Sequence, residues 1–185
     1  MTKVVISILG PDRPGIIAAV TRILFEQACN IENVSQTILQ SEFSGIFIAS
    51  IPEGLALEQL HGHLYDGLSP LNLHVYVKQL DPTAGAGFDA RNSEPFVITT
   101  KGPDRKGLVA AITEIIARYG ANVTNLQAVF KGGSDPANNV MIYEVDIPKE
   151  IDAQALYKDL RSKASELSLD ISIQHRNIFE AINRI

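Results

Sequence analysis

The chain contains one cysteine, Cys29, among 185 residues, so it can form neither an internal disulfide nor a cysteine-rich metal site. Such a sequence suits a reducing compartment, and we expect a cytoplasmic protein. Basic residues are also scarce, because 16 lysines and arginines stand against 21 aspartates and glutamates, for a net charge of -5. A protein that binds nucleic-acid phosphates normally carries a basic stripe. We therefore expect no direct contact with nucleic acid.

Long apolar runs are absent too. No stretch approaches the ~20 apolar residues that a membrane span requires, and the apolar run at 3–9 ends at Pro11, too early for a signal peptide. We therefore expect no membrane association. With 45% hydrophobic and 20% charged residues, the composition is that of a folded, soluble protein.

The sequence shows no catalytic motif. It has no phosphate-binding loop, no Ser-His-Asp grouping and no Gly-x-Ser-x-Gly elbow. His61 and His63 lie two apart on a predicted helix and point to different faces, which makes them a poor metal pair. His74 and His175 are interpreted as ordinary surface histidines, and Cys29 as a small buried hydrophobe. We expect a protein that is not an enzyme and that needs no metal or cofactor.

What the sequence does contain is a duplication. Residues 10–34 align without a gap with residues 102–126, and eleven of those 25 pairs are identical. The turn GPDRPG at 10–15 returns as GPDRKG at 102–107. The chain is therefore predicted to be a tandem repeat of one small domain.

Each copy shows the same succession of patterns. A short apolar strand is followed by an amphipathic helix, a hairpin of two β-rich segments, a second amphipathic helix and an alternating strand. In copy two the hairpin is joined by the longer loop GGSDPANN. The predicted strands are 3–9, 31–39, 43–51 and 71–78 in copy one, and 96–101, 123–130, 140–147 and 169–174 in copy two.

The predicted order is thus βαββαβ in each copy. Strands with one apolar face and helices with one apolar stripe are buried together when both helices cover one side of an antiparallel four-stranded sheet. The predicted fold class is α+β, with two ferredoxin-like domains. Residues 81–94 are rich in Gly, Ala and polar residues, and are interpreted as a linker between domains at 1–80 and 95–185.

The repeated turn has two interpretations. Asp12 and Asp104 stand where a helix N-cap is expected, and Gly15 and Gly107 stand in the predicted first helical turn, where glycine costs up to ~1 kcal/mol relative to alanine. An Asp-capped helix is the simpler interpretation. In the second interpretation, glycine is required because a nearby backbone segment or a ligand leaves no space for a Cβ at Gly15 and Gly107. The free N–H groups of the helix start then hold a carboxylate, and the aspartate holds an ammonium group, as a free amino acid requires.

Two asparagines also have two interpretations. Asn30 and Asn122 follow the first helix of each copy, where asparagine is favoured because it tolerates the left-handed conformation. Alternatively, an amide there both accepts from an ammonium group and donates to a carboxylate. The residue types alone leave both possibilities open.

The turn G-P-D-R-P-G, the helix and the segment C-N-I-E-N-V-S-Q-T together resemble the ACT domain, a ferredoxin-like module that binds amino acids and other small effectors. The resemblance covers nearly the whole chain as two copies. This pairing is similar to that of the glycine cleavage system transcriptional repressors. The tail at 174–185 resembles that of small ACT proteins, in which it extends the last strand and forms a short helix.

In amino-acid-binding ACT domains, the ligand contacts come from the loop after the first strand and from an asparagine that starts the second. Lys106 stands where the family commonly has proline, so the second loop is expected to be less rigid or to take another ligand. Carried over by position, the resemblance implies ligand-binding roles for Asp12, Arg13, Pro14, Gly15 and Asn30 in copy one, and for Asp104, Arg105, Gly107 and Asn122 in copy two.

The function implied by the resemblance is regulatory. We expect a homodimeric protein that senses an amino acid and controls amino-acid metabolism or transcription through a partner protein. The alternative is a ligand-free interaction module, which mediates oligomerisation or docking to an enzyme or regulator.

Overall fold

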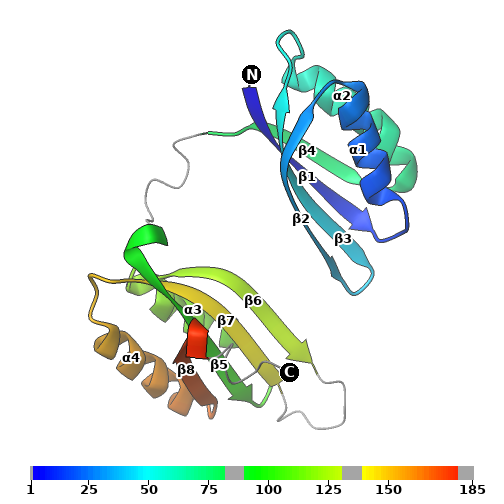
Figure 1. Cartoon of the computed structure of the whole chain (residues 1–185). Helices are drawn as coiled ribbons and strands as arrows, with labels where there is room; N and C mark the ends of the chain where they lie inside the picture. The colour runs from blue at the N-terminus through cyan, green and yellow to red at the C-terminus, as the bar shows by residue number, and fades with distance from the viewer. Residues whose placement is uncertain (1, 82–89, 131–138, 179–185) are drawn as a thin grey trace. The chain divides into compact units, whose positions relative to one another are not determined.

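The computed structural model of the chain describes residues 2–81, 90–130 and 139–178. The chain divides into two compact units, Met1–Ala84 (unit 1) and Gly85–Ile185 (unit 2). Each unit holds a four-stranded antiparallel sheet with two helices on one face, as Figure 1 shows. The predicted α+β class and the repeated βαββαβ order are confirmed.

The two units have matching elements and matching sheets. The strand order is β2-β3-β1-β4 in unit 1 and β6-β7-β5-β8 in unit 2. Unit 1 contains β1 (Thr2–Pro11), α1 (Ile16–Glu26), β2 (Asn30–Leu39), β3 (Glu42–Ile51), α2 (Leu57–Leu68), the short 3-10 helix η1 (Ser69–Leu71) and β4 (His74–Gln79). Unit 2 contains the short 3-10 helix η2 (Ala90–Asn92), β5 (Ser93–Gly102), α3 (Leu108–Arg118), β6 (Asn122–Phe130), β7 (Asn139–Pro148), α4 (Ala153–Glu166) and β8 (Asp170–His175).

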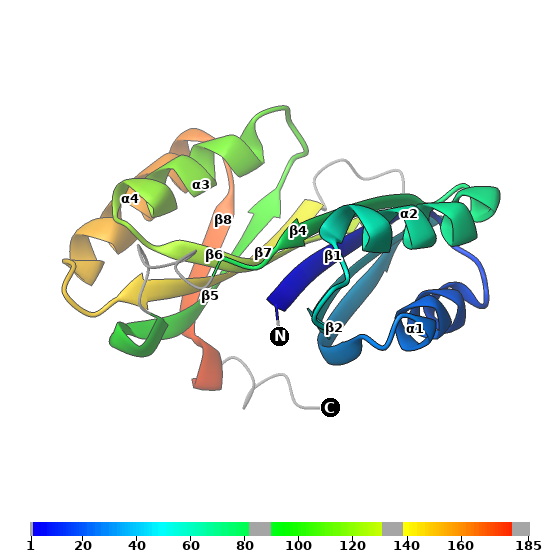
Figure 2. The ribbon, with the colours of Figure 1, turned by 90° about the horizontal axis from the view of Figure 1, so that it is seen from above.

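The core of each unit lies between its sheet and its helices, which Figure 2 shows as two layers. Alternate residues of the central strands point toward the helices, as the period of a strand requires. The helices bury the apolar faces that the sequence predicts: Ile16, Val20, Ile23 and Leu24 on α1, and Leu108, Ile112, Ile115 and Ile116 on α3. None of the helices in the described ranges is long and apolar enough to cross a membrane.

Some boundaries differ from the prediction. The last strand of unit 1 begins at His74 and not at residue 71, because Pro70 lies in η1 and Asn72 turns the chain with a φ of 58°. In unit 2, η2 and the first two residues of β5 fall inside the range expected as linker. The predicted loop at 132–139, apart from its last residue, lies outside the described residues. Residues 176–178 are helical, and the rest of the tail is not described.

The predicted N-cap is wrong. Helix α1 begins at Ile16, and its cap position is Gly15, with a φ of 96° and no side-chain hydrogen bond. Helix α3 begins in the same way after Gly107, whose φ is 88°. A Cβ on either glycine would meet nothing within 4 Å, so the glycines are needed for their left-handed backbone and not because of crowding. Crowding occurs instead at Gly10, where a Cβ would lie 2.6 Å from the carbonyl oxygen of Asn72.

The left-handed interpretation of the two asparagines is also wrong. The left-handed residue after α1 is Ala28, with a φ of 54°, and the one after α3 is Gly120, with a φ of 68°. Asn30 and Asn122 are instead the first residues of β2 and β6. Both copies have asparagine at this position, and the termination of the helix does not explain why.

The cap geometry predicts that Gly15→Ala destabilises unit 1. Alanine is the better helix former in general, but at this position it would have to adopt a left-handed conformation, which costs about 1–2 kcal/mol. We expect urea unfolding to show a loss of about 1 kcal/mol. The matched control is Gly62→Ala within α2, where a Cβ also meets nothing within 4 Å and the backbone is helical; it should gain up to about 1 kcal/mol. A Gly15→Ala variant as stable as Gly62→Ala would contradict the assigned geometry.

Candidate functional site

A cleft of about 590 Å³ opens in unit 1 between the start of α1 and the edge strand β2. The loop at 12–15 and the first turn of α1 form one wall. Gln36 and Ile38 of β2 form the other wall, and Phe43 of β3 forms the floor. The volume falls within the range of small-molecule sites, about 300–1,000 Å³.

The strand register brings these segments together. Gly10 at the end of β1 pairs with Phe43, which in turn pairs with Ile38 on the edge strand. The backbone N–H of Asp12 donates to the carbonyl oxygen of Ser41 at 2.7 Å, which fixes the loop to the β2–β3 turn. Because side chains alternate along a strand, Gln36 and Ile38 lie on the same face of the sheet as Phe43.

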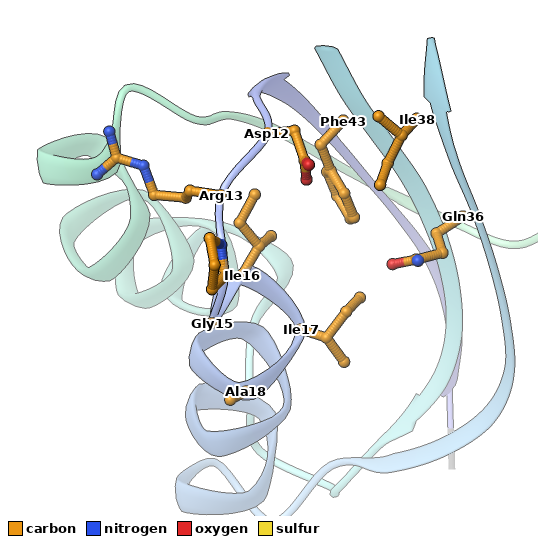
Figure 3. Close-up of a pocket in the computed structure, with 10 residues that line it drawn as sticks. Asp12, Arg13, Gly15, Ile16, Ile17, Ala18, Gln36, Ile38 and Phe43 are labelled. Atoms are coloured by element: carbon orange, nitrogen blue, oxygen red, sulfur yellow. The ribbon is translucent and has the colours of Figure 1, made fainter. Parts of the chain in front are cut away.

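Both polar and apolar groups point into this cleft. Figure 3 shows the Asp12 carboxylate and the Gln36 amide directed toward the space that Ile17, Ile38 and Phe43 also face. Ile38, on the helix-covered side of the sheet, is 50% exposed, and Ile17 on α1 is 36% exposed, although isoleucine side chains are mostly buried. The cleft therefore offers an apolar surface with an acid and an amide beside it.

The guanidinium of Arg13 extends away from the cleft, on the other side of the loop, as Figure 3 shows. Arg13 thus contributes to the lining without directing its charge into the space. Among the described residues, the side chains of Asp12 and Arg13 have no hydrogen-bond or ion-pair partner.

The start of α1 adds backbone donors to the cleft wall. With glycine at the cap position, no side chain accepts from the first-turn N–H groups of α1. Helix α4 shows the contrast, because Asp152 accepts there from the N–H groups of Gln154 and Ala155 at 3.0 and 3.1 Å. Uncapped first-turn N–H groups favour an anion.

The equivalent loop of unit 2 makes its own internal contacts. The Asp104 carboxylate accepts from Nδ2 of Asn139 at 3.2 Å. The guanidinium of Arg105 donates from Nη2 to the carbonyl oxygen of Leu167 at 2.6 Å. Lys106 and Gly107 are exposed. The predicted residues are therefore adjacent in unit 2, but its acid and its arginine are already hydrogen-bonded.

The two asparagines lie away from these loops within their own units. Asn30 pairs with Ser50, at the end of the sheet that holds the N-terminus of β1. The strand from Asn30 to Ile38 spans roughly 27 Å at about 3.4 Å per residue. Asn122 pairs with Asp146 at the corresponding end of the second sheet. Within one unit, the structure does not bring Asn30 to Asp12 or Asn122 to Asp104.

The site predicted from the sequence lacks six residues that line the cleft: Ile16, Ile17 and Ala18 in the first turn of α1, and Gln36, Ile38 and Phe43 on the strands. For the residues of β2, the sequence offered one signal, which is the alternation of side chains along a strand. This alternation places Val34, Gln36 and Ile38 on one face of a β-rich segment. That signal does not reveal that β2 is an edge strand whose helix-side residues stay exposed.

The other candidate chemistry is modest. Cys29 is half-buried, and burial raises the pKa of its thiol, which disfavours the reactive thiolate. No group of three or more His, Cys, Asp or Glu side chains that could hold a metal occurs within the described ranges.

The sequence matches a known family over both units. A family model described as ACT domain matches residues 2–78 and 94–174. A UPF0237 protein of Methanocaldococcus jannaschii is 41% identical over 90 residues, which are 48% of this chain and 96% of that protein. A UPF0237 protein of Methanopyrus kandleri is 33% identical over 82 residues, which are 44% of this chain and 91% of that protein.

Two solved structures share the fold over nearly the whole chain. A protein of unknown function from Galdieria sulphuraria has a TM-score of 0.75 at 20% identity, covering 94% of this chain and 98% of its own. A candidate glycine cleavage system transcriptional repressor has a TM-score of 0.64 at 19% identity, covering 94% of this chain and 96% of its own. At these identities the likeness concerns the fold.

Proposed function

Because the chain belongs to the ACT domain family, with one copy in each unit, we propose that it is a non-catalytic regulatory protein that senses a free amino acid. The observation that carries this proposal is the cleft of unit 1, where an uncapped helix start and the Asp12 carboxylate face one apolar-walled space. A free amino acid carries a carboxylate and an ammonium group on one carbon. The cleft offers a complement to each.

The proposed contacts follow from charge. The ligand carboxylate binds the first-turn N–H groups of α1, where the helix dipole also favours negative charge. The ammonium group donates to the Asp12 carboxylate in a charge-assisted hydrogen bond. The Gln36 amide supplies a further acceptor or donor from the opposite wall. Gly15 keeps the entrance free of a side chain.

Regulation requires that the ligand distinguish between two states of the protein. A ligand shifts a conformational or assembly equilibrium only by the difference between its affinities for the two states. We propose that the liganded form alters the docking of a partner protein that controls amino-acid metabolism or transcription. Such a role needs no basic surface, in keeping with the net charge of -5.

The edge strand β2 supports a second element of the proposal, which is association. Among the described strands it pairs only with β3, and it exposes Val34, Ile38 and Leu39 at 49%, 50% and 74%. Phe25 on α1 is 80% exposed. Unprotected apolar edges of this kind are normally covered by another chain. We propose that a second copy of the chain covers this edge.

Association along β2 would also give Asn30 a role. Two copies related by a two-fold axis pair their β2 strands antiparallel. The first residue of one strand then lies near the last residue of the other, so Asn30 of the second copy approaches the end of β2 that borders the cleft. The asparagine predicted from the sequence would in this way contact the ligand from the second copy.

Ligand binding is tested by thermal melts against each of the twenty amino acids. A ligand at 100 times its Kd stabilises the native state by about 2.7 kcal/mol, so at least one amino acid should raise the Tm. Asp12→Ala should weaken binding by about tenfold to a hundredfold, because it removes a charge-assisted contact worth roughly 1.5–3 kcal/mol. Its unliganded stability should stay within about 0.5 kcal/mol, since the Asp12 side chain has no partner among the described residues.

The matched control is Asp66→Ala, which removes an exposed acid from α2 outside the cleft and should bind normally. No shift with any amino acid would favour the ligand-free interaction module. Equal weakening by both variants would show that the lost charge, and not the Asp12 contact, matters.

Association is tested by light scattering at micromolar concentration. We expect about twice the 20.1 kDa mass of the chain. The double variant Val34→Lys with Leu39→Lys should be a monomer, because two lysines on an edge strand oppose pairing. Tyr65→Lys on α2, where the side chain is 53% exposed, is the control and should leave the dimer intact. A double variant that remains a dimer would place the interface elsewhere.

A further inference from the structure

The two loops of nearly identical sequence have different surroundings, and one strand position accounts for the difference. Phe43 pairs with Gly10 in unit 1, and Asn139 pairs with Gly102 in unit 2. Phe43 is 2% exposed and forms the apolar floor of the cleft. Asn139 is 7% exposed and donates to Asp104. The same position thus holds a cleft-lining hydrocarbon in unit 1 and an amide that hydrogen-bonds the loop in unit 2.

Neighbouring positions follow the same division. Ile8 and Phe47 in unit 1 correspond to Thr100 and Tyr143 in unit 2, as their pairing with equivalent residues shows. The core of unit 1 is one continuous cluster, whereas in unit 2 the residues Leu108, Ala164 and Leu169 form a cluster separate from the main core. Polar side chains therefore replace hydrocarbon beneath the loop of unit 2.

The opposite wall differs as well. Gln36 pairs with Gly45 in unit 1, and the equivalent residue of unit 2, Ala128, pairs with Met141. Ala128 has no group to hydrogen-bond a ligand. Among the described residues of unit 2, the loop therefore lacks the free acid, the amide wall and the apolar floor that together make the cleft of unit 1.

We infer that each chain binds one amino acid, in unit 1 only, and that this ligand has an apolar side chain. The inference rests on the proposed function and narrows it. The ligand side chain lies against Ile17, Ile38 and Phe43, where a polar group would lose its water without gaining a partner. Unit 2 keeps the turn as a structural element, with Asp104 held by Asn139 and Arg105 held by the carbonyl oxygen of Leu167.

The test is isothermal titration of the full chain with L-leucine, L-isoleucine, L-phenylalanine and L-asparagine. L-Asparagine is close to L-leucine in shape but polar. We expect a stoichiometry of one per chain, and at least tenfold weaker binding of L-asparagine than of the best apolar ligand. Two sites per chain, or L-asparagine as the best ligand, would overturn the inference.

Matched variants of the two units show which unit holds the binding site. Asp12→Asn should lose at least tenfold in affinity for the best ligand, and Asp104→Asn should bind as the unaltered chain does. Phe43→Asn gives unit 1 the residue type of unit 2 and should abolish binding. Because that variant could fail to fold, Gln36→Ala provides the parallel test at an exposed position and should lose several-fold in affinity.

The outcomes separate this inference from the proposal on which it rests. If none of the twenty amino acids binds the unaltered chain, the proposed function fails and the inference fails with it. If an amino acid binds but Asp104→Asn weakens it as much as Asp12→Asn does, the chain is a sensor and only the assignment to unit 1 is wrong. Unchanged binding by both Gln36→Ala and Phe43→Asn would also overturn the assignment.

Discussion

In each unit, the first strand leads into the first helix through a glycine at the N-cap position, which carries no side chain. In unit 1 this constraint shapes the rest of the cleft. Gly15 adopts a φ of 96°, which glycine reaches without the steric cost that a Cβ imposes. The turn leaves the first N–H groups of α1 unclaimed and directs Asp12 toward the edge strand. A capping side chain, such as Asp152 provides for α4, would have occupied those donors. The open helix start is thus a consequence of this backbone conformation, which Gly107 shares in unit 2.

Duplication supplies two such turns, and the strand beneath each turn decides how its acid is used. A buried phenylalanine offers no donor, so Asp12 of unit 1 keeps its carboxylate available. A buried asparagine needs partners for its amide, and Asp104 accepts from it. The Oδ1 atom of Asn139 is buried without a partner in the described part of the chain, and the hydroxyl of Tyr143 lies buried in the same unit. Unit 2 therefore carries polar groups in its interior that unit 1 replaces with hydrocarbon.

The sequence predicted the elements well because periodicity depends on burial alone. The stripe on α1 and the alternation along the strands follow from which faces meet the core. The cap was predicted wrongly because aspartate and glycine are both acceptable cap residues, and only the φ of Gly15 separates them. Asn30 and Asp12 belong to one sequence motif, but Asn30 begins β2 whereas Asp12 lies in the loop near the other end of that strand. A sequence motif does not reveal this separation in space.

The ungapped alignment of the two copies could not predict that Asp12 is free whereas Asp104 is hydrogen-bonded. Residues of β1 and β5 correspond at a spacing of 92, whereas Phe43 and Asn139 are 96 apart, because the second hairpin loop is longer. Their equivalence emerges only from strand register. To predict Gln36 and Ile38 as cleft residues, one must know that β2 lies at the edge of the sheet.

The most direct test of a single amino-acid site in unit 1 is a titration of the isotope-labelled chain with L-leucine, followed through its backbone amide signals by NMR. The account predicts that signals of residues 12–18, and the side-chain amide of Gln36, move on titration, while those of residues 104–110 stay in place. Movement confined to residues 104–110, or equal movement at both loops, would contradict it.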